Sequence, residues 1–169
     1  MVTDVPVDDL EERIRAMLDA ACQKDIRIAT AESCTGGLLS AMITDIDGVS
    51  HAFERGFVTY SETAKAEQLG IQRDMIEREG AVSESVARAM AEGALAHSDA
   101  HVAIAITGFA GPAKGDAEEG LVHFACASDT HPTRHVERHF GSIGRDAIRA
   151  AALDIAVRML AAAIDTTPD

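Results

Sequence analysis

The stretch IRIATAESCTGGLLSAMI, residues 26–43, constrains the fold most, because its hydrophobic pattern changes at two adjacent glycines. Residues 26–31 form a short apolar run that is typical of a buried strand, whereas residues 38–46 have the apolar spacing of a helix. Gly36 and Gly37 lie between them, where the chain has to turn sharply. A strand that leads through a tight turn into a helix predicts a layered α/β fold.

The rest of the chain continues this alternation. Ser61 and Ser83 are expected to cap helix N-termini, and Gly70 follows the helix that Ser61 begins. The last two strands flank the turn sequence SDTHPT and are expected to form a hairpin. Helices are predicted over residues 7–23, 38–46, 62–69, 83–98 and 143–164, and strands over residues 26–31, 56–60, 101–107, 121–127 and 134–140.

These elements predict a single-domain layered α/β sandwich with a mixed, mostly parallel sheet flanked by helices. A length of 169 residues suits one domain, predicted over residues 1–169 with its core at about residues 8–160. The sequence contains no linker, no internal repeat and no low-complexity segment.

The charge of the chain excludes several classes of partner. Lysine and arginine number 15 against 28 acidic residues, so the formal net charge is −13. A surface this acidic repels nucleic acid and anionic membranes, and neither is expected as a partner. No run reaches the roughly 18 apolar residues of a membrane span. An anionic substrate would need a local pocket of hydrogen-bond donors.

The cysteines and histidines predict no metal and no cofactor. The three cysteines are too few and too scattered for a disulfide framework or a zinc site, which favours a reducing, cytoplasmic location. His135 and His139 share a face of a predicted edge strand, and a solvated polar face explains them better than a metal does.

The turn after the first strand concentrates reactive side chains. Ser33 lies between the strand and the helix, and backbone N–H groups at Gly36 and Gly37 would favour a phosphate or an oxyanion at the helix start. The alternative is that Ser33 or Thr35 merely caps the helix. Cys34 is a rival nucleophile, although a lone thiol in a small α/β core more often serves packing.

The segment GFVTYSETAK contributes a second pair of reactive groups. With Ser61 as the N-cap, Tyr60 and Lys65 occupy the two positions that meet in a hydrophobic staple. A phenol beside an amine suits proton transfer to activate a serine, provided that the pKa of the lysine falls from about 10.4 to about 7–8. The alternative is a solvated Lys65 paired with Glu62 or Glu67.

Two further segments supply candidate ligand contacts. Thr107 and Gly108 end a strongly apolar strand, and ligands of α/β domains commonly bind beyond the carboxyl ends of strands. Arg145 and Arg149 lie one helical turn apart and would grip a phosphate together, unless they form salt bridges with the abundant acids.

Five segments in this order resemble the CinA C-terminal domain family. They are AESCTGG, FERGFVTYSETAK, GAVSESVARAMAEGAL, VAIAITGFAGP and GLVHFA, and the resemblance runs from about residue 8 to residue 160. It implies an α/β fold and hydrolysis of the carboxamide of nicotinamide mononucleotide, yielding nicotinate mononucleotide and ammonia in the recycling of pyridine nucleotides toward NAD.

The resemblance also implies roles for individual residues. Ser33 would be the nucleophile, and Lys65 and Tyr60 would be the activating pair. The substrate contacts implied on this chain are Thr35, Gly36, Gly37, Thr107, Gly108, Arg145 and Arg149, with Arg145 favoured over Arg149. The loop AKGDAEEG is shorter and more acidic than is common in the family, so its substrate contacts stay open.

Two other function classes are weighed against the amidase. The family's association with competence suggests a non-catalytic nucleotide-binding or regulatory module. An oxidoreductase is discarded, because Tyr60 and Lys65 are separated by four residues rather than three and the chain lacks a G-x-G-x-x-G loop. The expected partners are the small-molecule substrate and further copies of the chain, in a homodimer or higher homo-oligomer.

Overall fold

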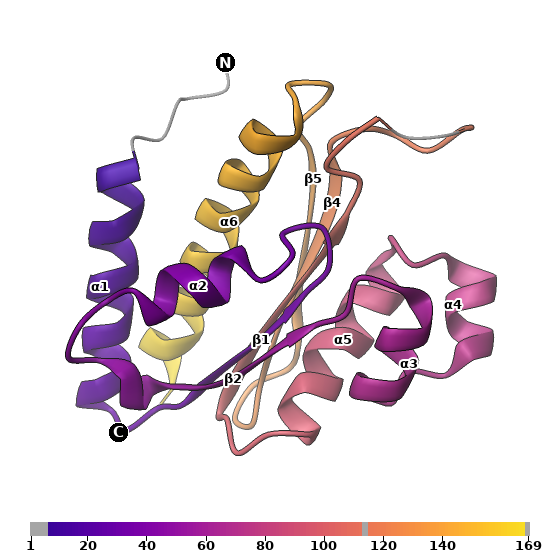
Figure 1. The fold of residues 1–169 in the computed structure, drawn as a ribbon. Coiled ribbons are helices and arrows are strands. Elements are labelled where there is room, and N and C mark those ends of the chain that lie inside the picture. Colours follow the sequence, from indigo (N-terminus) through magenta and orange to yellow (C-terminus); the bar gives the residue numbers. More distant parts are fainter. Residues whose placement is uncertain (1–6, 113–114, 168–169) are drawn as a thin grey trace.

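The computed structural model describes residues 7–112 and 115–167, and its five strands form one sheet in the order β2-β1-β3-β4-β5 (Figure 1). The strands are β1 (Ile28–Glu32), β2 (Phe53–Val58), β3 (Val102–Gly108), β4 (Leu121–Ser128) and β5 (Arg134–His139). The helices are α1 (Val7–Gln23), α2 (Leu38–Thr44), α3 (Glu62–Leu69), α4 (Arg73–Glu79), α5 (Glu84–Ala96) and α6 (Arg145–Thr166), with a short 3₁₀ turn at Ser50–Ala52.

The sheet is mixed, and four of its strands run in the same direction. β1 pairs in parallel with β2 and with β3. β4 is antiparallel to both β3 and β5, so it alone runs the opposite way. The predicted α/β class and the predicted hairpin of the last two strands are therefore confirmed.

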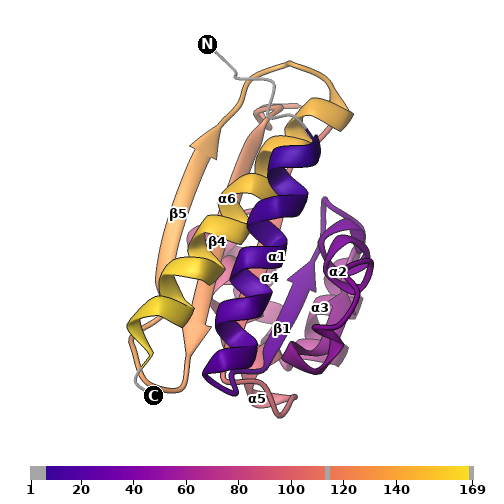
Figure 2. The same cartoon turned by 90° about the vertical axis from the view of Figure 1, so that its left-hand side faces the viewer.

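Helices cover both faces of the sheet (Figures 1 and 2). The connection from β1 to β2 contains α2, which lies on the same face as α1 and α6. The connection from β2 to β3 contains α3, α4 and α5 on the opposite face. Crossover connections between parallel strands are right-handed. The connection from β1 to β2 and the connection from β2 to β3 lead in opposite directions across the sheet, so their helices lie on opposite faces. The strand order thus reverses between β1 and β3, where α/β domains bind their ligands.

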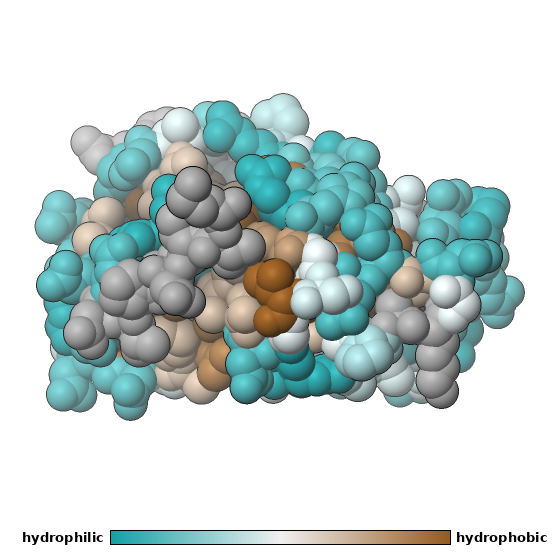
Figure 3. Space-filling view, turned by 90° about the horizontal axis from the view of Figure 1, so that it is seen from above, coloured by the Kyte–Doolittle hydropathy of each residue, from teal (hydrophilic) through white to brown (hydrophobic). Residues whose placement is uncertain are grey.

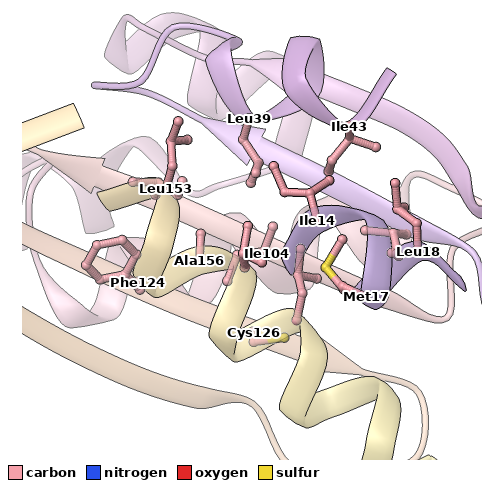
Figure 4. Packing of buried hydrophobic residues seen from close by; sticks show 14 of the residues in the cluster. Ile14, Met17, Leu18, Leu39, Ile43, Ile104, Phe124, Cys126, Leu153 and Ala156 are labelled. Atoms are coloured by element: carbon pink, nitrogen blue, oxygen red, sulfur yellow. The ribbon is translucent and has the colours of Figure 1, made fainter. Parts of the chain in front are cut away.

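The two faces of the sheet differ in the size of their side chains. On the α1 and α6 face, Ile104, Phe124 and Cys126 pack against large residues such as Ile14 and Leu153 (Figure 4). On the α5 face the three central strands present small side chains where α5 packs, and they are Ala29, Ala31, Ala103, Ala105, Ala125 and Ala127. Methyl groups leave room for α5 to lie close against the sheet.

Two elements differ from the sequence prediction. β2 begins at Phe53 rather than residue 56, because its charged residues and Gly56 interrupt the apolar pattern of a half-exposed edge strand. α4 was not predicted, since it is short, largely charged and preceded by Gln72, which provides no side-chain cap. The predicted caps Ser61 and Ser83 are confirmed, each accepting a hydrogen bond from a backbone N–H of the following helix.

Among the described residues, no helix combines the length and the apolar character that a membrane crossing requires. Residues 113–114 of the shortened AKGDAEEG loop lie outside the described residues.

Gly93 sets the approach of α5 to α3, which gives a testable consequence. A Cβ atom at this position would lie 2.3 Å from the carbonyl oxygen of Leu69. We expect Gly93→Ala to lower the free energy of unfolding by about 1–3 kcal/mol, because this overpacking outweighs the gain of about 1 kcal/mol in helix propensity. Urea denaturation measures the change. Ala96→Ser, at an exposed position of α5, is the control and should stay within about 0.5 kcal/mol of the parent; equal stability of the two variants would contradict this packing.

Candidate active site

A pocket of about 380 Å³ opens where β1 and β3 end, at the point where the strand order reverses. Residues from five parts of the chain line it, and they include Ser33 after β1, Lys65 of α3, Val82 before α5, Thr107 of β3 and Arg145 of α6. Figure 3 views the end of the molecule at which these strands finish, and hydrophilic residues cover most of that surface around a few apolar groups. The size suits a small-molecule ligand.

Ser33 and Lys65 meet inside this pocket. The Lys65 Nζ atom lies 2.8 Å from Ser33 Oγ and also donates to the backbone carbonyl of Thr59 at 2.8 Å. The Ser33 backbone N–H donates to the Ile106 carbonyl, which fixes the serine against β3. The hydroxyl and the amine therefore meet as predicted. Along the chain, Ser33 precedes β2 and Lys65 follows it.

Lys65 is buried to an unusual degree for a lysine, with 1% of the residue exposed. Burial is the main cause that lowers its pKa, while Cys34 and Glu62 act weakly in the opposite direction. No carboxylate forms an ion pair with it in the described part of the chain. The solvated, salt-bridged Lys65 that the sequence left open is thus wrong, because the amine points into the fold toward Ser33.

Cys34 does not have the chemistry of a nucleophile. Its side chain is buried, and that burial raises the pKa of its thiol to about 11. At neutral pH the group is therefore a thiol, whereas nucleophilic attack needs the thiolate. Cys34 contributes a wall of the pocket beside Ser33.

The turn that carries Ser33 is held by Glu32, the acid of the AESCTGG segment. This buried carboxylate accepts hydrogen bonds from the backbone N–H groups of Gly37 at 3.1 Å, Leu39 at 3.0 Å and Ser40 at 2.8 Å. The Ser40 hydroxyl adds a fourth bond at 2.7 Å. An acid just before a helix start is the signal that could have revealed it, since carboxylates stabilise helix N-termini.

Glu32 corrects the expected role of the two glycines. The Gly37 N–H is bound to Glu32, and the Gly36 N–H donates to the carbonyl of Ser33. Both amides are engaged, and neither glycine lines the pocket, so they do not form the anion cradle that the pattern suggested. Their positive φ angles of 62° and 95° explain the glycines instead, because the turn needs left-handed backbone.

The remaining hydroxyl candidates lie in different surroundings. Tyr60 stands at the mouth of the pocket with 65% of the residue exposed, and its phenol forms no hydrogen bond within the described ranges. The expected contact of Tyr60 with Lys65 is therefore not formed. Thr107 lines the pocket and donates to the Ala81 carbonyl, next to Gly108. Thr35 is buried outside the pocket, and its hydroxyl has no partner among the residues described.

The two arginines of α6 have separate tasks. Arg145 lines the pocket, where one of its nitrogens would lie 2.5 Å from a Cβ atom on Gly111. Arg149 instead donates from Nε to the Cys34 carbonyl at 2.9 Å and so supports the serine turn from α6. Within the described residues neither guanidinium forms an ion pair, which contradicts the salt-bridge alternative.

No group of three or more histidine, cysteine, aspartate or glutamate side chains is arranged to hold a metal in the part of the chain that the structure covers. On β5, His139 contacts Glu118 and Glu137, and His135 stacks on His123 of β4. The pocket therefore presents the Ser33 hydroxyl, the Lys65 amine and the Arg145 guanidinium, with the Tyr60 phenol and the Glu62 carboxylate also in its lining.

Comparison with known families identifies this arrangement. Residues 8–164 match the CinA C-terminal domain. The chain belongs to the CinA C-terminal domain family. Two CinA-like proteins, from Akkermansia muciniphila and Syntrophobacter fumaroxidans, are 49% and 48% identical to it over 71% and 79% of this chain. The aligned regions span 30% and 32% of those longer proteins.

Other CinA-family relatives match nearly end to end. The nicotinamide-nucleotide amidohydrolase PncC of Escherichia coli K12 is 42% identical over 161 residues, which cover 94% of this chain and 95% of that protein. The crystal structure of the competence/damage inducible protein CihA from Agrobacterium tumefaciens superposes with a TM-score of 0.90 at 40% identity, covering 97% of this chain and 99% of that one.

The buried carboxylate of Glu32 yields a stability prediction. Both carboxylate oxygens of Glu32 accept hydrogen bonds from backbone N–H groups. In Glu32→Gln one of these oxygens becomes an NH₂ group, which cannot accept them, so either orientation of the amide places two donors against each other. We expect a loss of about 2–4 kcal/mol in the free energy of unfolding.

Chemical denaturation tests this, with Glu11→Gln as the control because Glu11 is exposed on α1 and the charge change is the same. If both variants unfolded at the same denaturant concentration, Glu32 would not be holding the turn.

Proposed function

We propose that this chain is a serine amidohydrolase that converts nicotinamide mononucleotide and water into nicotinate mononucleotide and ammonia, in the cytoplasm and in the service of pyridine nucleotide recycling. The name of the E. coli relative supports the substrate. The observation that carries the proposal is the buried amine of Lys65 at 2.8 Å from the hydroxyl of Ser33, in a pocket that also presents Arg145.

Lys65 acts as the general base of the first step. With its pKa lowered by burial, the neutral amine accepts the Ser33 hydroxyl proton while it donates to the Thr59 carbonyl. Ser33 Oγ then bonds to the carboxamide carbon to form a tetrahedral intermediate. The proton passes directly from Ser33 to Lys65 without Tyr60 as a relay, because the Lys65 amine is already within hydrogen-bond distance of the Ser33 hydroxyl.

The backbone N–H of Cys34 stabilises the oxyanion of that intermediate. The residue after a nucleophile supplies this donor in other strand-to-helix turns. In this turn the amides of Ser33, Gly36 and Gly37 donate to other residues, whereas those of Cys34 and Thr35 donate to no other residue in the described part of the chain. Of these two residues, Cys34 lines the pocket and Thr35 does not. One such donor is worth about 3–4 kcal/mol of transition-state stabilisation.

Protonated Lys65 next gives its proton to the departing nitrogen, so ammonia leaves and a nicotinoyl ester remains on Ser33. A water molecule attacks that ester and gives one proton to Lys65. Lys65 then returns this proton to Ser33 Oγ as the ester bond breaks, which releases the carboxylic acid product, ionised at neutral pH, and restores the Ser33 hydroxyl and the neutral amine. The atoms balance as amide plus water to carboxylic acid plus ammonia, with both half-reactions using the same base.

Arg145 and Tyr60 bind the rest of the substrate. The Arg145 guanidinium is exposed on the pocket wall and suits a phosphate monoester. Thr107 and Gly108 form the wall beneath, at the end of β3. Tyr60 stands at the mouth, where its ring contacts the bound pyridine or ribose and its hydroxyl becomes satisfied when the substrate enters.

The first functional test compares two neighbouring residues. We expect Ser33→Ala to lower the rate of ammonia release from nicotinamide mononucleotide at least about 1,000-fold, whereas Cys34→Ala retains activity within about fivefold. A coupled ammonia assay measures both, with circular dichroism as a check on folding. An active Ser33→Ala enzyme would overturn the serine mechanism. Nucleotide binding without any turnover in the parent would support the regulatory module instead.

The second functional test is the pH profile. Because Lys65 must be neutral to accept a proton, we expect kcat/KM to rise with pH through its lowered pKa and to level off below pH 10.5, the ordinary lysine value. Lys65→Met should lose both the activity and this rise. Lys24→Met, at a lysine that binds backbone carbonyls near the end of α6, is the control and should keep the profile. A rate that falls over the same range would mean that protonated Lys65 is the active form.

A further inference from the structure

A second concave site lies on the opposite edge of the sheet, between β5 and α6. This β5–α6 groove encloses about 360 Å³ and shares no lining residue with the pocket around Ser33. Figure 2 shows α6 running alongside β5, the outermost strand. Since α6 contacts β3 and β4 more than this edge, the inner face of β5 is left partly uncovered.

The floor of the groove is apolar. Val136 projects from β5, and Ile155 and Met159 project from α6. All three are partly exposed residues that pack against the main hydrophobic core. Such a floor accepts a hydrocarbon or aromatic body rather than a bare inorganic ion.

Three arginines surround this floor. Arg134 and Arg138 are four residues apart on β5 and therefore project to the same face, and Arg158 approaches from α6. The Arg134 guanidinium is close enough to the buried Cys126 thiol to influence its pKa, which places it over the groove. No aspartate or glutamate side chain lines the site.

Two of these three arginines have no carboxylate partner among the described residues, as is also true of Arg145 and Arg149. Arg158 is bound to Asp154 through Nε, and Arg138 donates only to the backbone carbonyl of Glu137. Arg134 makes no ion pair within the described residues, although the chain has 28 acids for 15 lysines and arginines. The guanidinium groups of Arg134 and Arg138 are therefore available to bind an anion above the apolar floor.

We propose that the β5–α6 groove binds a small amphipathic anion, in which one carboxylate or phosphate group is held by Arg134 and Arg138 and an apolar body lies on Val136, Ile155 and Met159. The volume limits the ligand to a small molecule. The net charge of −13 disfavours a polyanion, whose long-range repulsion by the rest of the surface exceeds the attraction of three arginines.

Anilinonaphthalene sulfonate, a fluorescent aromatic anion, is a suitable probe because the chain contains no tryptophan to interfere. We expect saturable binding of one molecule per chain. Arg134→Gln/Arg138→Gln should weaken it at least tenfold, and Ala162→Phe, which fills the groove, should abolish it. The control is Arg73→Gln/Arg78→Gln, which changes the net charge equally at two arginines of α4 paired with Glu67 and Glu79. It should bind within twofold of the parent.

Competition identifies the chemistry of the natural head group. Octanoate or hexyl phosphate should displace the probe, and whichever does so at lower concentration names the preferred anion, whereas neutral octanol should be at least tenfold weaker. Thermal melting by circular dichroism verifies that each variant is folded.

Three outcomes would overturn the proposal. They are equal probe affinity in both double variants, displacement by octanol as readily as by the anions, and sedimentation showing that the parent self-associates while Arg134→Gln/Arg138→Gln is monomeric. The last result would assign the groove to a second copy of the chain. Because the groove is separate from Ser33, none of these results depends on the amidase activity.

Discussion

The arrangement of the active site depends on one buried carboxylate. Glu32 ends β1 and binds the first amides of α2, so the strand and the helix are joined by four hydrogen bonds across a turn of five residues. Thr30 extends this network through the Ser40 hydroxyl, and Gly56 of β2 leaves the space, since a Cβ atom there would lie 2.6 Å from Ser40 Oγ. With the α2 face of the strand committed to structure, Ser33 is presented on the opposite face, toward α3.

The same geometry explains why a lysine is tolerated in the interior. Burial raises the free energy of a charged amine more than that of a neutral one, and the lowered pKa of Lys65 reflects this difference. The Thr59 carbonyl and the Ser33 hydroxyl satisfy it as a neutral group. The fold thus holds this amine away from water and from any carboxylate partner among the described residues, and such a cost in stability is usual at functional sites.

Much of this architecture could be predicted from local sequence. The caps at Ser61 and Ser83, the apolar strand β3 and the hairpin of β4 and β5 all follow short-range rules. Local rules failed for α4 and for the start of β2, where charged residues hide elements that tertiary contacts stabilise.

Of the residues predicted for the site, some line the candidate pocket, such as Ser33, Lys65 and Arg145, whereas Thr35, Gly36, Gly37 and Arg149 do not. Spacing on α3 alone left Lys65 equally suited to solvent or to the core, and only the tertiary structure, which buries Lys65 against Ser33, decides between them. The glycine pattern suggested an anion cradle, yet the cradle is filled by Glu32, a residue five positions away from the amide it binds. Arg145 lines the pocket and Arg149 binds the Cys34 carbonyl, and this difference likewise depends on where α6 begins relative to the serine turn.

The unequal side-chain sizes on the two faces of the sheet have a consequence for how this fold can diverge. Where alanines meet α5 and Gly93 meets Leu69, nearly every substitution adds atoms to a layer that has no room for them. The layer beneath α6 contains isoleucine, leucine and phenylalanine, whose volumes can be exchanged among neighbours. We therefore expect few substitutions to be tolerated on the α5 side of the sheet and more on the α6 side. Engineered changes to the α6 side should leave the positions of Ser33 and Lys65 unchanged.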